Sequence, residues 1–257
     1  MINFKDYNID HIYCINYLPD NQLNHMKNEF DFIGIDYNDN RIFSWEFDFD
    51  NNIQYWHYDE ILKSLNLRYE YIKNQCGFFD NKLLNKTVKL CLRNYSIFKK
   101  AYALGYNKIA VLEDDINFLK DINLIKDILD NIDWNCDIIS LCPTCEFSRF
   151  NTEDKELKKI YDTVYENTEY NLISKNLKLW DIYSAGFNVY NRKAIEAAIY
   201  VMENYSLFSM DLYYFFTLYS EDIKVCTTKY PICVQNKDYN NITRFETTPE
   251  MYRNYKL

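Results

Sequence analysis

The amino-acid sequence predicts an α/β fold with an open, mostly parallel sheet flanked by helices. Short apolar runs typical of buried strands alternate with segments of helical periodicity along the chain. The chain opens in the order strand, helix, strand, and a run of three acidic residues later follows an apolar strand directly. Open α/β sheets bind ligands at the carboxyl ends of their strands, so these acids mark the expected functional edge. We expect one domain over residues 1–257.

The first elements form the strand-helix-strand opening. Residues 11–15 are mostly apolar or aromatic and predict a buried strand. A helix over residues 25–30 and a short strand over residues 32–35 are expected next. Residues 36–59 are polar and aromatic by turns without helical periodicity, which predicts irregular structure or a short hairpin.

A long helix and a core strand precede the acidic run. Apolar residues recur in steps of four and three at Leu84, Val88, Cys91, Tyr95, Phe98 and Tyr102. Gly105 is a natural end for this helix, because glycine readily adopts the left-handed conformation found at helix ends. Residues 108–112 (KIAVL) are mainly aliphatic and predict a core strand with a charged tip.

The rest of the chain continues the alternation of strands and helices. We expect a helix at residues 121–132, strands at 137–141, 183–190 and 229–234, and helices at 192–203 and 210–218. Residues 151–178 are charged and are expected to form an insertion with some helix.

The composition excludes several classes of protein. With 48% hydrophobic residues and only 4 Gly and 4 Pro, the chain is a packed protein rather than a disordered or collagen-like one. A net charge of -9 disfavours nucleic acid as a partner, because phosphate-backbone binding needs clustered Lys and Arg. No apolar run approaches the roughly 18 residues that a transmembrane segment needs. We therefore expect a cytoplasmic protein, or one peripheral to the inner face of a membrane.

Cysteines, histidines and common catalytic motifs give weaker signals. The 8 cysteines are spread along the chain, several in apolar runs, so we expect reduced thiols and no disulfide framework. Cys142 and Cys145 form a C-x-x-C motif, but suitably spaced partners for a zinc site are lacking, and packing explains it better than redox chemistry. The 3 histidines have no metal-ligand spacing and are expected to be structural. The chain lacks glycine-rich phosphate-binding loops and a G-x-S-x-G motif.

The run Glu113-Asp114-Asp115 is the strongest candidate for a functional site. In an extended segment alternate side chains share a face, so Glu113 and Asp115 would point together and Asp114 away. Two carboxylates at the carboxyl end of a strand can hold a divalent cation, which in turn can neutralise a diphosphate. The alternative is a solvated surface turn in which Asp115 caps the next element. An aspartyl-phosphate protein is a rival metal-binding class, although its acids would be expected after the first strand.

Three stretches of the chain resemble glycosyltransferase family 25, the lipooligosaccharide and collagen galactosyltransferase-like enzymes with a GT-A, Rossmann-like fold. The most specific is KLCLRNYSIFKKAYALGYNKIAVLEDDI over residues 89–116, which resembles the block around the family's "LEDDV" without gaps. Residues 12–27 resemble the opening strand and helix, with the family's "INL-x-R-R-P-D-R" pattern. Residues 184–194 and 210–212 resemble a later strand and helix and a "VD" element.

The resemblance implies an inverting, metal-dependent hexosyltransferase. It would take a nucleotide-sugar donor such as a UDP-sugar with Mn²⁺ or Mg²⁺, and a glycan or lipooligosaccharide acceptor, as in lipopolysaccharide biosynthesis. Asp115 would be the direct metal ligand and Glu113 a second one, acting through water or contacting the ribose. Ile15, Asn16, Glu113 and Asp114 would contact the donor. Asp211 would be the general base, with helix capping as its alternative role.

The chain also departs from the family pattern. Tyr17, Leu18, Asn21 and Gln22 stand where the family has basic residues. Arg93 and Asn94 replace a Ser-His pair, and Arg93 could restore a positive charge, although a lone helical Arg is more often at the surface. Gln235 or Asn236 could contact the pocket in place of a late histidine. These departures keep a second reading open, that of a catalytically inactive sugar- or nucleotide-binding descendant.

Overall fold

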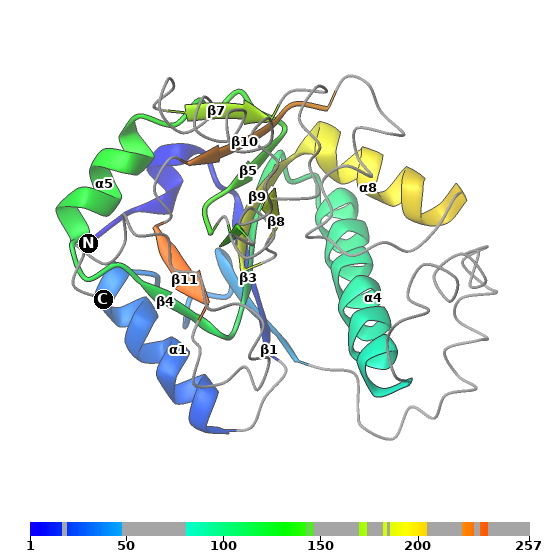
Figure 1. The fold of residues 1–257 in the computed structure, drawn as a ribbon, viewed down its shortest axis with the longest axis horizontal. Helices are drawn as coiled ribbons and strands as arrows, with labels where there is room; N and C mark the ends of the chain where they lie inside the picture. The colour runs from blue at the N-terminus through cyan, green and yellow to red at the C-terminus, as the bar shows by residue number, and fades with distance from the viewer. Residues whose placement is uncertain are drawn as a thin grey trace, which may run out of the picture.

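A seven-stranded sheet forms the centre of the fold, in the order β2-β1-β3-β9-β5-β10-β7 (Figure 1). The fold is that of a computed structural model, which describes residues 1–16, 20–47, 81–142, 144–145, 170–173, 182–183, 186–204, 223–228 and 232–235. The strands of the sheet are β1 (His11–Asn16), β2 (Phe43–Phe47), β3 (Lys108–Glu113), β5 (Ile138–Ser140), β7 (Tyr170–Ile173), β9 (Phe187–Asn191) and β10 (Val225–Thr228). Two short ladders pair β4 (Ile116–Phe118) with β11 (Cys233–Gln235) and β6 (Thr144–Cys145) with β8 (Ile182–Tyr183).

The strand directions make the sheet mostly parallel. β1 pairs in parallel with β2 and β3, and β5 pairs in parallel with β10. β9 lies between β3 and β5 and runs antiparallel to both, while β7 runs antiparallel to β10 at the edge. Strands β1, β2, β3, β5 and β10 therefore all end at one edge of the sheet, here called the carboxyl edge. The predicted open, mostly parallel sheet is confirmed.

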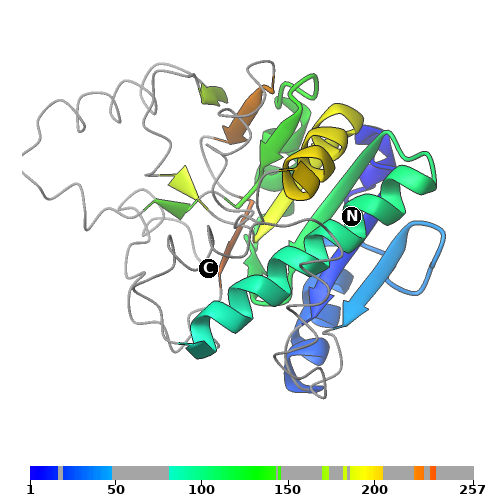
Figure 2. The same ribbon diagram turned by 90° about the vertical axis from the view of Figure 1, so that its right-hand side faces the viewer.

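Helices cover both faces of the sheet (Figures 1 and 2). They are α1 (Asp20–Ile33) and α5 (Ile122–Asp130) on one face, and α4 (Asn81–Ala103) and α8 (Arg192–Asn204) on the other, with a short 3-10 helix η1 (Phe4–Tyr7) near the start. On the first face, Met26, Phe30 and Leu129 belong to the same buried core as Leu112 of β3. On the second, the ring of Phe98 packs 5.0 Å from that of Tyr190.

The central strands form because their side chains are buried on both faces. Four consecutive residues of β3, from Ile109 to Leu112, are at most 2% exposed. A strand buried on both faces needs a continuous apolar run, and KIAVL supplies it. Helix α4 ends at Ala103, close to the expected end: Gly105 has φ 76°, and the N–H of Tyr106 donates to the carbonyl oxygen of Ala101 (3.1 Å).

Several predicted elements differ from the observed ones. Residues 32–35 are not a strand, because α1 continues through Ile33. The second strand is β2, inside the segment 36–59 that was expected to be irregular or a short hairpin. The predicted strand 183–190 is divided between β8 and β9. The predicted helix 210–218 and most of the insertion 151–178 lie outside the described residues.

The remaining predictions for the second half are close to the observed bounds. Asp121 caps α5, accepting from the N–H groups of Asn123 (3.0 Å) and Leu124 (3.1 Å). The predicted last strand 229–234 is displaced to β11, and β10 before it was not predicted. Within the described ranges, no helix has both the length and the apolar character that crossing a membrane requires. The single-domain assignment stays a prediction.

Candidate functional site

The site is built where β1, β3 and β9 meet at the carboxyl edge. Ile15 of β1 is in register with Glu113, the last residue of β3, so the two strands end side by side. β9 begins at the same edge because it runs the other way, and Leu112 is in register with Phe187. The N–H of Glu113 donates to the carbonyl oxygen of Gly186 at 3.0 Å. This ladder fixes the point at which the acidic run leaves the sheet.

The acidic turn, Glu113-Asp114-Asp115, is a buried feature rather than a solvated loop tip. Asp114 is 1% exposed and Asp115 is 8% exposed, while Glu113 is partly buried. β3 ends at Glu113, Asp114 and Asp115 form a turn, and β4 begins at Ile116. The expected alternation of faces, with Asp114 pointing away from the other two acids, does not apply because the chain is not extended here. The alternative of a solvated surface turn is wrong for both aspartates.

All three carboxylates influence the pKa of one buried thiol, that of Cys14 on the neighbouring strand β1. Cys14 of β1 is fully buried, and burial is the first cause that raises the pKa of its thiol well above the usual value. The negative charges of Asp114, Asp115 and Glu113 raise that pKa further, in this order. The thiol therefore stays protonated at neutral pH. The acids concentrate negative charge around the ends of β1 and β3, which favours a cation there.

The donor chemistry of the turn suits a hard divalent cation. Carboxylate oxygens are the ligands that Mg²⁺ prefers, and they also bind Mn²⁺. Within the part of the chain that the structure describes, no group of three or more His, Cys, Asp or Glu side chains is arranged so that it could hold a metal ion. An ion held by the turn would therefore take part of its coordination from water or from the oxygens of a bound ligand.

The other predicted site residues are placed differently. The side chain of Ile15 is 1% exposed and belongs to the core, so only its backbone could contact a ligand. Asn16 ends β1 at the carboxyl edge, beside the end of β3. Asp211 and Asn236 lie outside the described residues, whereas Gln235 ends β11 in register with Ile116.

Arg93 is not the surface residue that its isolation in the sequence suggested. Its side chain is 11% exposed and lies on α4, with a guanidinium nitrogen 3.7 Å from a carboxylate oxygen of Glu46 on β2. The same carboxylate binds Lys100 more closely, at 3.1 Å. Glu46 is in register with Ile15, so β1 lies between Glu46 on β2 and the acidic turn at the end of β3. Glu46 was not among the predicted site residues, because β2 was not recognised as a strand.

The expectation that all cysteines are reduced thiols is wrong for one pair. Cys136 and Cys226 form a disulfide that links the segment before β5 to β10. Because these two cysteines are 90 residues apart, their pairing could not be predicted from the sequence. Cys142 of the C-x-x-C motif is a buried free thiol that hydrogen-bonds with the thiol of Cys233. Burial and this contact raise the pKa of Cys233 well above its usual value, which disfavours its reactive thiolate.

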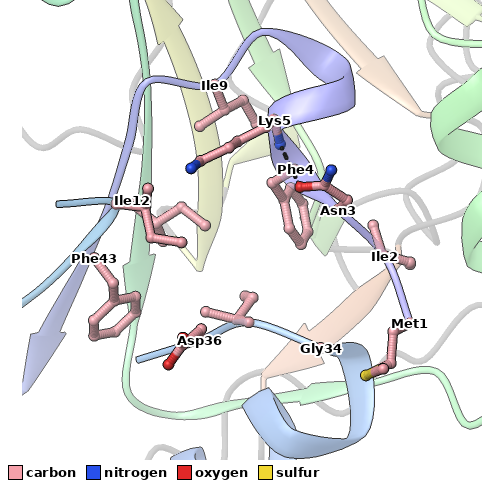
Figure 3. A pocket seen from close by; sticks show the side chains of 12 residues that line it. Met1, Ile2, Asn3, Phe4, Lys5, Ile9, Ile12, Gly34, Asp36 and Phe43 are labelled. Atoms are coloured by element: carbon pink, nitrogen blue, oxygen red, sulfur yellow. Dashed lines mark hydrogen bonds between the residues drawn. The ribbon is translucent and has the colours of Figure 1, made fainter. Parts of the chain in front are cut away.

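A cavity lies at the opposite edge of the sheet (Figure 3). It has a volume of about 430 Å³ and is lined mainly by apolar side chains, among them Phe4, Ile9, Ile12 and Phe43. Ile12 and Phe43 are near the beginnings of β1 and β2, so the length of a strand separates this cavity from the acidic turn. It does not belong to the candidate site.

The fold and the site define a mixed α/β protein with a buried acidic turn at the carboxyl edge of a mostly parallel sheet. No protein-family profile matches the chain, and no curated protein matches it. Among solved structures it is similar to the crystal structure of a glycosyltransferase involved in the glycosylation of the major capsid of PBCV-1. The identity is 8%, the match covers 88% of this chain and 92% of that chain, and the TM-score is 0.28. So low a similarity assigns no function, which depends on the residues themselves.

Proposed function

We propose that this protein is a metal-dependent glycosyltransferase of the GT-A type that transfers a sugar from a nucleotide-sugar donor to an acceptor hydroxyl. The observation that carries the proposal is the burial of Asp114 and Asp115 directly beyond the end of β3, beside the end of β1. Burying adjacent carboxylates is unfavourable by several kcal/mol unless a cation or hydrogen-bond donors compensate their charge. A fold that maintains this arrangement is expected to use it.

The residues of the site would have distinct tasks. Asp115 and Glu113 would hold a divalent cation, which would supply positive charge to the leaving diphosphate. Asp114 and the backbone of Ile15 and Asn16 would contact the donor nucleotide. Asp211 would accept the proton of the attacking hydroxyl, whose oxygen forms the new glycosidic bond as the bond from the sugar to the diphosphate breaks.

The family resemblance refines the proposal. It suggests an inverting hexosyltransferase with Mn²⁺ or Mg²⁺, a UDP-sugar donor and a glycan or lipooligosaccharide acceptor, acting in the cytoplasm or at the inner face of a membrane. Arg93 could supply positive charge in place of the missing amino-terminal arginines. It is largely buried on α4 beside Glu46 of β2, and β1 lies between β2 and β3, the strand that leads into the acidic turn. The missing arginines themselves favour the second candidate, an inactive descendant that binds a sugar or a nucleotide.

The test is release of nucleoside diphosphate from a panel of nucleotide sugars, with Mn²⁺, with Mg²⁺ and with a chelator. We expect release only with metal, and at least about a 100-fold loss in Asp115→Asn, because several kcal/mol of transition-state stabilisation depend on the cation. Asp121→Asn is the matched control, because asparagine caps a helix as well as aspartate does. Metal-independent release, or full activity of Asp115→Asn, contradicts the proposal. Metal-dependent donor binding without transfer identifies the inactive descendant.

The assignment of the general base has its own test. Asp211→Asn is expected to abolish transfer and to leave metal-dependent donor binding intact, because an amide cannot accept the proton. Transfer rates and donor affinity measured on the same preparation separate the two effects. Full transfer activity in this variant would remove Asp211 from the mechanism.

A further inference from the structure

We propose that His25 and Glu29 of α1 are positioning residues that hold β4 and thereby fix the geometry of the acidic turn. The inference rests on the proposed function, because it assigns these residues to the cation site of that function. Neither residue lies in the acidic turn. Their role comes from two hydrogen bonds to the backbone of the strand that follows the turn.

Among the described residues, β4 pairs with another strand along one of its two edges. Its partner is β11, with Asn117 in register with Val234. On the other edge, the carbonyl oxygen of Ile116 lies 3.1 Å from Nε2 of His25. A carbonyl oxygen can only accept, so Nε2 carries the proton. The N–H of Phe118 donates to Oε2 of Glu29 at 2.7 Å. The helix therefore supplies one donor and one acceptor, as a neighbouring strand would.

The spacing of the two elements makes this pairing possible. His25 and Glu29 are four residues apart on a helix, which places them on one face with an axial separation of about 6 Å. Ile116 and Phe118 are two residues apart on a strand, so their backbone groups face the same side and their Cα atoms are about 6.6 Å apart. One turn of helix thus matches two residues of strand. The two hydrogen bonds can form together without distortion of either element.

The charge of Glu29 is already compensated within the protein. Glu29 is 6% exposed, and its Oε1 accepts from the ammonium group of Lys120 at 2.5 Å. That ammonium group also lies 4.9 Å from the centroid of the Phe32 ring. With Oε2 on the backbone of Phe118 and Oε1 on Lys120, this carboxylate is committed to structural contacts. We therefore assign Glu29 to positioning rather than to cation binding.

The acidic turn is consequently fixed at both ends. Before the turn, the N–H of Glu113 is bonded to the carbonyl oxygen of Gly186 in the main sheet. After the turn, the first and third residues of β4 are bonded to α1. Groups that orient metal ligands through hydrogen bonds commonly change metal affinity by 10- to 100-fold when they are removed. Loss of the α1 contacts should release Asp115, which directly precedes Ile116.

The experiment measures Mn²⁺ affinity by isothermal titration calorimetry in His25→Leu and Glu29→Leu, and in the rescuing variants His25→Gln and Glu29→Gln. We expect the leucine variants to bind Mn²⁺ at least about 10-fold more weakly. The glutamine variants keep a donor or an acceptor at the same place and should bind within about threefold of wild type. Asn24→Leu is the matched control, an exposed position on the same helix.

Hydrogen exchange at the Phe118 amide provides a readout that does not depend on metal or activity. When exchange is measured well below the melting temperature of each protein, it should be faster in Glu29→Leu and close to wild type in Glu29→Gln. Unchanged exchange, or Mn²⁺ affinity equal to wild type in a folded His25→Leu protein, overturns the positioning role alone. Failure of the glutamine variants to rescue also overturns it. Absence of Mn²⁺ binding in the wild-type protein, with and without nucleotide, overturns the proposed function and the positioning role with it.

Discussion

The two edges of the central sheet differ in what they bury. At the amino edge, where β1 and β3 begin, Oδ2 of Asp10 accepts from the N–H groups of Asn107 (2.6 Å) and Lys108 (2.9 Å), and the neighbouring cavity is mainly apolar. At the carboxyl edge, the same two strands end beside clustered carboxylates that are largely withdrawn from water. The comparison indicates that one edge favours stability, whereas the other gathers like charges in a buried position, as functional sites often do.

The largest effect should come from opening the amino edge. Phe43 is 2% exposed, and its ring lies 5.2 Å from that of Phe30 and 5.0 Å from that of Trp45. Phe43→Ala would enlarge an existing cavity and is expected to lower the free energy of unfolding by about 3–5 kcal/mol. Urea denaturation measures the loss. A change below about 1 kcal/mol would contradict the assignment of this edge to stability.

The next largest effect should come from the disulfide. Cys136→Ser removes a cross-link between residues 90 apart in the sequence, which should lower the free energy of unfolding by about 2–4 kcal/mol. Thermal denaturation with and without a reductant checks this prediction. The reductant should lower the melting temperature of the wild-type protein and leave that of Cys136→Ser unchanged. Equal sensitivity of the two proteins would show that the cross-link does not contribute.

A smaller, pH-dependent effect is expected from His11 at the amino edge. It is 3% exposed, and burial is the main cause that lowers its pKa below the usual 6.5. Because the unfolded chain takes up the proton more readily, stability is fully present above pH 6.5 and is lost as the pH falls below that value. One such group contributes a slope of at most about 1.4 kcal/mol per pH unit.

The variant that checks this pH dependence is His11→Gln, which cannot titrate. Its free energy of unfolding should fall less than that of the wild type between pH 7.5 and pH 5.5. Chemical denaturation of both proteins at several pH values in this interval gives the two slopes. Identical slopes would mean that burial of His11 does not contribute to the acid sensitivity of the fold.

The smallest effect on stability should be found at the carboxyl edge. Asp115→Asn removes one charge from a repulsive cluster, so the metal-free variant should be as stable as the wild type or more stable by up to about 1 kcal/mol. With Mn²⁺ at about 100 times its dissociation constant, the wild type should gain about 2.7 kcal/mol and the variant much less. Thermal denaturation with and without Mn²⁺ measures both. A strongly destabilised metal-free variant would assign Asp115 to structure.

The core strands could be predicted from the sequence, but β2 could not. β1 and β3 are buried on both faces, so their apolar runs are recognisable without knowledge of their neighbours. In β2, Phe43 packs in the core beneath α1, whereas Ser44 lies 2.8 Å from Nε2 of His11 and Glu46 binds Lys100. Those polar partners come from distant parts of the chain. The alternation in FSWEF was present in the sequence, but Ser44 and Glu46 could not be recognised as one face of a strand without knowing their partners.

The acidic turn was found because its residues are contiguous, whereas its support was missed because it is not. Glu113, Asp114 and Asp115 directly follow an apolar strand, a pattern that is visible in a single sequence. His25 and Glu29 reach β4 across about 90 residues of sequence, through the packing of α1. Neither the turn conformation nor the burial of Asp114 and Asp115 followed from local propensity, since both depend on β4 and its ladder with β11.

The reversed direction of β9 has a consequence for how such a protein can diversify. Because β5 ends and β9 begins at the carboxyl edge, the stretch from Cys142 to Gly186 starts and finishes on the same side as the acidic turn, and it contributes β6, β7 and β8 in between. The chain likewise leaves the described core after Phe47 at the end of β2 and re-enters it through α4, which leads back to the start of β3. Insertions in these two stretches that fall outside β6, β7 and β8 would leave strand order and register intact. The topology thus lets evolution remodel the surroundings of the acids while the scaffold stays constant.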